Sequence, residues 1–323
     1  MSSVGSTVSG NFMLEPASVN NIEFDSSGSQ TINNASYGIV SITANYSPEV
    51  LLVFVAIKGS ASTVSNIVSS PTLTWIKLGG CSNSTNVRGE IWYALAAPTS
   101  PPQTYSVTVN LSSAAYAVLL AGGFAGCNIA YVSSAFTGMP IDPTSLASTP
   151  GSGTGSATVP IMTNSTVNPA DFLIGFLACL GAPSGLGAGT NFTLIVKASQ
   201  STNVSGLAEY EMLTAANAAN PIYFNFTTSE EYVAIAVGLM SGGNNTQSVQ
   251  PASGYEWQIQ DLFMNGDVAV SMWDGKTPAY ISTMVSANTN LTIQVNNGLF
   301  MVLINPSATS DVEVGYDGVV TAV

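Results

Sequence analysis

The feature that most limits the fold of this chain is a long succession of short β-rich runs between residues 29 and 240. Clusters of Gly, Ser, Asn and Pro separate the runs, and no stretch combines helical periodicity with capping residues. The clearest runs lie at residues 37–44, 50–57, 72–78, 90–95, 105–111 and 116–120. This pattern predicts an all-β protein built from antiparallel strands.

The runs occur twice in the same order. The first half reads VLLVFVAIKG, LTWIKLG, EIWYALAA, YSVTVNL and AAYAVLLAGGFAG, and the second reads DFLIGFLACLG, FTLIVKA, AEYEMLTAA, IYFNFTT and EEYVAIAVGLM. In this comparison Glu90 stands opposite Glu209. Two similar groups of strands suit a two-sheet sandwich in which each half adds strands to both sheets. We expect a large jelly-roll-like antiparallel β-sandwich, with an immunoglobulin-like topology as the alternative.

The composition divides the chain into four parts. Residues 1–28 form a polar arm, suited to lying across a neighbour or staying mobile, and residues 29–240 form the sandwich with its internal pseudo-repeat. Residues 241–252, rich in Gly, Asn and Ser, are an expected linker. Residues 253–323 carry four Asn-Gly or Asp-Gly turn signals between short runs and predict a small β-barrel or sandwich.

The chain contains no histidine, and only 7% of its residues are charged. These features exclude Ser-His-Asp and Cys-His nucleophile pairs and histidine-liganded zinc. The formal net charge is -13, and five scattered cations cannot form a basic patch for nucleic acid. No nucleotide- or cofactor-binding motif is present. A surface of hydroxyl and amide groups suits an acidic exterior, and a sheltered assembly interface explains it as well.

Cysteines and glycosylation sequences bear on the compartment. Cys81, Cys127 and Cys179 are either small buried apolar residues or one disulfide plus a free thiol. Ten Asn-x-Ser/Thr sequences are candidate glycosylation sites if the protein meets a glycosylating compartment. They are Asn34, Asn45, Asn83, Asn110, Asn164, Asn191, Asn203, Asn225, Asn244 and Asn290.

Two segments bear on membranes and export. Residues 114–132 are uncharged, but their Gly122-Gly123 pair and short apolar bursts predict two buried strands and a turn rather than a membrane span. Residues 1–16 lack the cationic start and apolar core of a signal peptide. We therefore expect a protein that works outside the cell without an export signal, as virion proteins do.

Acidic residues offer two candidate sites. Glu209 and Glu211 lie two apart on an expected strand, so both carboxylates project from one face. Such a pair is compatible with a glycosidase and equally with a polar outer face. Residues 261–274 contain acid-rich turns that suit either Ca²⁺ or ordinary turn chemistry.

One aromatic residue is a candidate contact with a ligand or host. Trp273 precedes Asp274, Gly275 and Lys276 in an expected hairpin. An exposed Trp273 would stack on a sugar ring, with Lys276 beside it. Packing into the core is the alternative.

The C-terminal part runs from ASGYEWQIQDLF through MWDGKTPAYI to VEVGYDGVV. It resembles β modules at the C-termini of phage head-fibre and decoration proteins. The larger region, with TWIKL followed by EIWYALA, is similar to β-sandwich modules of phage and archaeal-virus structural proteins. The resemblance implies a turret, spike, vertex or decoration subunit of an icosahedral virion, which assembles in the host cytoplasm as a symmetric oligomer. It implies no catalytic residues, cofactor or metal. The implied partners are copies of the chain, other capsid proteins and a host-surface glycan or protein.

Two other functions stay open on the sequence. One is a surface filament or adhesive protein of an acid-living archaeon. The other is a carbohydrate-binding module or glycosidase that uses Glu209 and Glu211. Our expectation is the virion surface protein, which is not an enzyme.

Overall fold

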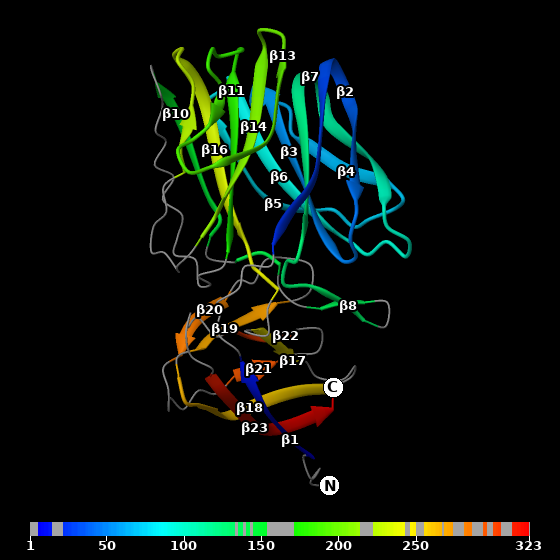
Figure 1. Cartoon of the computed structure of the whole chain (residues 1–323), viewed down its shortest axis with the longest axis vertical. Coiled ribbons are helices and arrows are strands. Elements are labelled where there is room, and N and C mark those ends of the chain that lie inside the picture. Colours follow the sequence, from blue (N-terminus) through cyan, green and yellow to red (C-terminus); the bar gives the residue numbers. More distant parts are fainter. Residues whose placement is uncertain are drawn as a thin grey trace.

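The computed structural model describes residues 6–14, 22–132, 135–137, 140–142, 145–153, 171–213, 222–242, 246–249, 255–266, 268–273, 281–285, 293–295, 300–304 and 312–322. These ranges hold strands and connections but no helix, so the all-β class and the antiparallel sandwich are confirmed. Figure 1 shows two bodies along the long axis of the molecule. The larger is the sandwich, and the smaller contains the C-terminal strands.

The first sheet of the sandwich has the order β2-β7-β3-β6-β5, and β4 also pairs with β7. Its strands are β2 (Glu23–Ala44), β3 (Glu49–Lys58), β4 (Val64–Ser70), β5 (Ile76–Asn83), β6 (Val87–Ala96) and β7 (Gln103–Ala125). The second sheet has the order β10-β16-β11-β14-β13. Its strands are β10 (Ala147–Gly153), β11 (Phe172–Leu180), β13 (Thr193–Gln200), β14 (Val204–Met212) and β16 (Glu230–Leu239). Each half of the region therefore forms one sheet by itself, whereas we expected each half to add strands to both.

Strand β3 explains why its sequence is apolar without alternation. Val50, Leu52 and Phe54 face the core between the two sheets, and the alternate residues Leu51 and Val53 face a second core on the other side. A strand buried on both faces reads as a continuous hydrophobic run. The second core exists because another layer covers the outer face of the first sheet.

That outer layer is made by two long strands that fold over. β2 is 22 residues long and β7 is 23, and their pairing is irregular where each bends, between Ile32 and Tyr37 on β2. Residues 23–32 of β2 lie in the first sheet, and residues 37–44 lie in the outer layer with residues 103–111 of β7 and with β4. Apolar side chains of this layer, such as Val40, Ile42 and Val107, pack into the second core.

The two sheets contain matching hairpins. In the first, the β5–β6 hairpin pairs Asn83 with Val87, and in the second the β13–β14 hairpin pairs Gln200 with Val204. Each hairpin has a register shift at the corresponding place, between Lys77 and Gly79 and between Leu194 and Val196. Since these positions correspond, Trp92 is the counterpart of Glu209, and Glu90 is the counterpart of Leu207. The residue pairing of Glu90 with Glu209 from the sequence comparison was wrong.

The two halves meet at the end of the sandwich where β7 and β16 finish, which we call the foot. Cys127 and Ser241 form an isolated antiparallel bridge, and the amide of Gly242 donates to the carbonyl of Gly126 at 2.8 Å. Both segments directly follow corresponding strands, β7 and β16. The bridge therefore joins equivalent positions of the two halves. After each of these two positions the chain leaves the sheets of the sandwich.

The smaller body contains two four-stranded sheets, β1-β23-β18-β21 and β17-β22-β19-β20. Its strands are β1 (Ser6–Leu14), β17 (Thr246–Val249), β18 (Tyr255–Met264), β19 (Val268–Trp273), β20 (Ile281–Val285), β21 (Ile293–Val295), β22 (Phe300–Ile304) and β23 (Val312–Ala322). A core that includes Ile259, Met301 and Val314 holds them together. β1 comes from the expected polar arm and pairs with β23 from Ser6↔Val320 to Leu14↔Val312. β17 lies within the segment expected as a linker.

Four short strands lie in two further pairs. β8 (Ala130–Val132) pairs with β9 (Ala135–Thr137), and β12 (Gly187–Ala188) pairs with β15 (Phe224–Asn225). The uncharged segment 114–132 contributes to β7 and β8. A search of the described ranges finds no helix with the length and apolar character needed to cross a membrane.

Candidate functional site

The outer layer of the first half presents an uncharged face. In one row Ile39 and Val68 both lie opposite Thr108, and in the next Tyr37 and Asn66 both lie opposite Asn110. The outward residues of the three strands are Tyr37, Ile39, Ser41, Thr43, Asn66, Val68, Ser70, Thr104, Ser106, Thr108 and Asn110. None of the eleven carries a charge. We call these residues the neutral face.

Three large apolar side chains lie near one end of the neutral face. Tyr37 is 57% exposed, Ile39 46% and Val68 49%. Hydroxyl and amide groups surround them. An exposed apolar group with a neutral polar rim is the anatomy of a protein contact surface.

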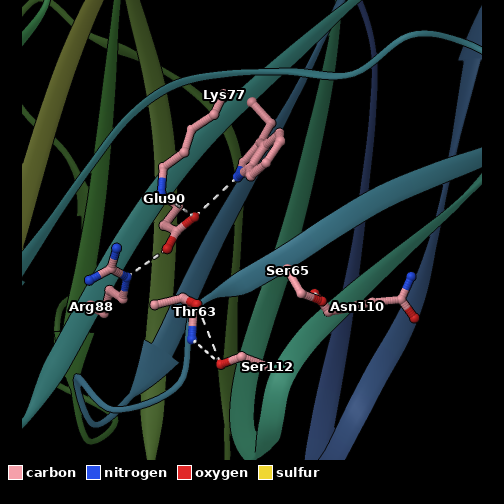
Figure 2. Close-up of polar contacts among 8 residues, drawn as sticks. Thr63, Ser65, Lys77, Arg88, Glu90, Asn110 and Ser112 are labelled. Atoms are coloured by element: carbon pink, nitrogen blue, oxygen red, sulfur yellow. Dashed lines mark hydrogen bonds and ion pairs between the residues drawn. The ribbon is translucent and has the colours of Figure 1, made fainter.

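The neutral face is firmly attached to the sandwich. The hydroxyl of Ser65 donates to the carbonyl of Asn110 at 3.0 Å, and the amide of Thr63 donates to the hydroxyl of Ser112 at 3.0 Å. Figure 2 shows these four residues at the bend where β4 and β7 run together. In the described chain, β4 and residues 37–44 of β2 each pair with β7 alone, so both edges of the layer are open. Open edges without charge can also pair with another chain.

A buried ion-pair cluster lies on β5 and β6. The Glu90 carboxylate is fully buried and contacts Lys77 Nζ at 2.8 Å and Arg88 Nε at 2.6 Å. The indole nitrogen of Trp92 donates to the same carboxylate at 3.2 Å. Figure 2 shows Glu90 between the two cations. These contacts compensate for burying the charge, and they occupy two of the five cations of the chain.

Two acidic residues occupy corresponding positions at the foot of the sandwich. Glu49 pairs with Ala96 at the start of β3, and the carbonyl of Asp171 accepts from the amide of Leu213 at the start of β11. Both are fully buried. Burial raises the pKa of Glu49 to about 8 and raises the pKa of Asp171 well above its usual value. Glu49 Oε2 lacks a hydrogen-bond partner, and the neighbouring carboxyl group of Asp142 raises the pKa of Asp171 further.

The same two acidic residues affect the pKa of the Cys127 thiol. Burial raises the pKa of its thiol, and the charges of Glu49 and Asp171 raise it further. A thiol in this setting stays protonated and unreactive. All three cysteines are free, with Cys127 and Cys179 buried and Cys81 half-buried.

Glu209 and Glu211, the candidate carboxylate pair, lie on β14 with different exposure. Glu209 is fully buried, and its Oε2 accepts from the amide of Gly189 at 2.9 Å while Oε1 lacks a partner. Burial raises its pKa to about 8. Glu211 is half-buried. In this conformation the Glu209 carboxyl group is closed to a sugar chain.

The remaining sequence candidates are scattered. Trp273 ends β19, but its side chain, like all of Lys276 and Asp274, lies outside the described residues. Among the candidate glycosylation sites, Asn34, Asn45, Asn191 and Asn225 are exposed, and Asn83, Asn110 and Asn203 are half-buried. Asn164, Asn244 and Asn290 lie outside the described residues. In the described part of the chain, no three His, Cys, Asp or Glu residues gather as metal ligands.

Sequence reasoning missed the neutral face although it recognised the strands that form it. Residues 37–44 read YGIVSITA, in which Ile39 and Val40 are both apolar. Periodicity alone does not say which of the two faces outward. The available signal was the absence of charged residues from the three segments that form this face, residues 37–44, 64–70 and 103–111.

The chain matches no protein-family model, and no curated protein is significantly similar to it.

Proposed function

We propose that this chain is a structural protein of a virion surface, which assembles as a symmetric oligomer through its neutral face. The carrying observation is that this face displays Tyr37, Ile39 and Val68 among neutral polar groups and contains no charge. The virion assignment draws on the resemblance of the C-terminal module and of the TWIKL and EIWYALA segments to phage and archaeal-virus structural proteins.

Net charge supports a second copy as the occupant of the face. Each chain carries a formal charge of -13, so two copies repel each other least where they meet through a surface without charge. A neutral face also avoids the cost of removing charged groups from water. The three apolar side chains then become buried, as in the centre of an oligomer interface.

The fold also suits a rigid building unit. Three stacked layers enclose two cores, and the salt bridges of the described residues are both on Glu90. Stability therefore depends mainly on apolar packing and main-chain hydrogen bonds. These are less sensitive to salt than surface ion pairs are.

Self-assembly is tested by native mass spectrometry and light scattering of the purified chain. We expect a defined oligomer for the natural sequence and a monomer for the double variant Ile39→Asp, Val68→Asp. Met212→Asp is the matched control, because Met212 is 51% exposed on β14, away from the neutral face. A natural chain that stays monomeric at all concentrations, or a double variant that assembles normally, would contradict the proposal.

The virion assignment needs a separate measurement. Particles purified from the producing culture are analysed by mass spectrometry and imaging, and we expect this chain among their surface proteins. Detection of the chain in cell membranes or cytosol alone would overturn the assignment.

A further inference from the structure

A cavity lies at the end of the sandwich opposite the smaller body. Its volume is about 420 Å³, and residues from the turns after β3 and β5, the bends of β2 and β7 and the end of β11 line it. β3 runs from Glu49, near the foot, to Lys58, which lines the cavity. Ten extended residues span about 30 Å, so the cavity is well separated from the foot. In Figure 1 the bend of β2, which contributes Asn34 to the cavity, lies at the upper end of the sandwich, and the smaller body lies below the sandwich.

The cavity contains a cation without an acidic partner. Lys58 is exposed, its Nζ donates to Asn203 Oδ1 at 2.8 Å, and it lies 5.5 Å from the centre of the Tyr116 ring. Both neighbours are neutral. In the described chain no carboxylate lies within 4.0 Å of the Lys58 ammonium group, in contrast to Lys77 and Arg88.

Acidic residues at this end are engaged elsewhere. Glu231 Oε2 accepts from the side chain of Asn86, and Glu230 lies against Gly181. Neither lines the cavity. The polar lining groups that resemble those of sugar-binding sites are the amide of Asn34 and the hydroxyls of Thr85 and Ser113. The Asn86 side chain and the Ser62 hydroxyl also line the cavity, but they donate to Glu231 and to the carbonyl of Ser113.

The second half of the sandwich offers an internal comparison. The amide of Gly59 donates to the carbonyl of Asn86, and the amide of Gly181 donates to the carbonyl of Asn203, so these positions correspond. Leu180, directly before Gly181, is therefore the counterpart of Lys58.

The same comparison applies to the aromatic ring. Ala117 pairs with Ile57 and Tyr232 pairs with Cys179 at corresponding positions, so Glu231 is the counterpart of Tyr116. The second half therefore forms the same backbone structure with Leu180 in place of Lys58 and Glu231 in place of Tyr116. The fold alone does not require a lysine above a tyrosine ring.

We propose that this cavity binds a carboxylate-bearing sugar, with Lys58 pairing with the carboxylate and the Asn, Ser and Thr groups bonding the hydroxyls. A charge-assisted hydrogen bond to the ammonium group supplies the preference for an acidic over a neutral sugar. The cavity is open to solvent on one side, and its volume of about 420 Å³ leaves room for one sugar unit. The inference refines the proposed function, on which its biological meaning rests, by naming the chemistry that the exposed end of the assembled protein contacts.

The test is a titration of the purified full-length chain, followed by NMR, with glucuronic acid, N-acetylneuraminic acid and neutral glucose. We expect at least one acidic sugar to bind about tenfold more tightly than glucose. Lys58→Gln reduces that binding about tenfold. Lys197→Gln is the matched control, because Lys197 is also exposed and donates to the carbonyl of Leu186, and it leaves binding unchanged.

A second variant guards against a folding defect. The double variant Lys58→Leu, Tyr116→Glu copies the residues of the second half, so we expect it to fold with an unchanged melting temperature and to lose sugar binding. Equal binding of glucose and the acidic sugars, no binding of any of them, or full binding by Lys58→Gln would overturn the inference. The assembly variant Ile39→Asp, Val68→Asp keeps sugar binding, so failure of self-assembly and failure of the cavity are distinguished.

Discussion

Ser84 and Ser201 adopt the same left-handed backbone conformation, with a φ of 49° at each residue. Each follows the last residue of a strand, and the turns that they begin close with the same hydrogen bond, from Asn86 to Asn83 and from Asn203 to Gln200. The two sheets are therefore built on matching hairpins. Where corresponding positions carry different residues, as Lys58 and Leu180 do, the fold does not require either residue.

The first prediction concerns pH and the buried carboxyl groups. The pKa of Glu49 and of Glu209 is about 8 in the folded chain, against 4.5 for a free glutamate. The folded state holds these two protons more tightly than the unfolded state does. The protonated carboxyl groups therefore contribute fully to the free energy of unfolding below about pH 4.5, and this contribution is lost as the pH rises through 8. The loss amounts to roughly 2 to 4 kcal/mol for each group. We expect the melting temperature to be highest in acid and to fall towards pH 8.

The matched variants identify the groups responsible. Glu49→Gln and Glu209→Gln each flatten the dependence of the melting temperature on pH, because glutamine stays neutral. Glu23→Gln removes an exposed carboxylate and leaves the slope unchanged. A melting temperature that rises from about pH 4.5 to 8 would be inconsistent with this account.

The second prediction concerns the Glu90 cluster. Glu90→Gln leaves Lys77 and Arg88 beside a neutral, fully buried side chain. The Lys77 side chain is 37% exposed and that of Arg88 is 20% exposed, so water can solvate the cations left behind. We therefore expect a loss of roughly 1.5 to 3 kcal/mol, the range for a hydrogen bond to a charged group. Urea denaturation measures this loss, with Glu23→Gln as the control. A loss below about 0.5 kcal/mol, typical of a surface change, would contradict the role of the cluster.

The third prediction concerns the N-terminal strand. Removal of residues 1–14 deletes β1, which pairs with β23 over nine residues. β23 becomes an edge strand, so we expect faster hydrogen exchange of its amides and a lower melting temperature of the smaller body. Removal of residues 1–5 keeps β1 and serves as the control. Equal exchange in both truncated chains would show that β1 does not protect β23.

The fourth prediction concerns the fold-over of β2. A Cβ atom at Gly28 would clash with the carbonyl oxygen of Ser41, because the two halves of the strand approach closely there. Gly28→Ala therefore destabilises the sandwich by about 2 kcal/mol or more in chemical denaturation. Gly187→Ala is the control, since the nearest atom to its Cβ would be 3.6 Å away. Similar stability of the two variants would rule out a tight fold-over.

The strands were predictable where sequence pattern and burial agree. Residues 50–57 are apolar throughout and lie within β3, which is buried on both faces. The runs at 105–111 and 116–120 were also recognised, but they belong to one bent strand, β7. The Gly122-Gly123 pair suggested a turn, but both glycines lie within β7 and pair with β3. Pairing with β2 and β4 accompanies the bend between the two runs.

Sites assembled from distant segments could not be predicted from the sequence. The cavity beside Lys58 combines turns that are far apart in the chain, and the pairing of β1 with β23 joins its two ends. Glu209 was correctly placed on a strand, but its burial depends on Gly189 and on the packing around Gly175. Such contacts are properties of the tertiary fold and leave no local pattern.

The pairing of Ser6 with Val320 has a practical consequence for engineering the protein. An affinity tag or fluorescent reporter fused at either end of the chain would be attached to the smaller body. The turn after β3, at the other extreme of the sandwich, would remain unobstructed. The protein is therefore a suitable scaffold on which peptides grafted into that turn are presented to solvent while both fusion points stay at the base.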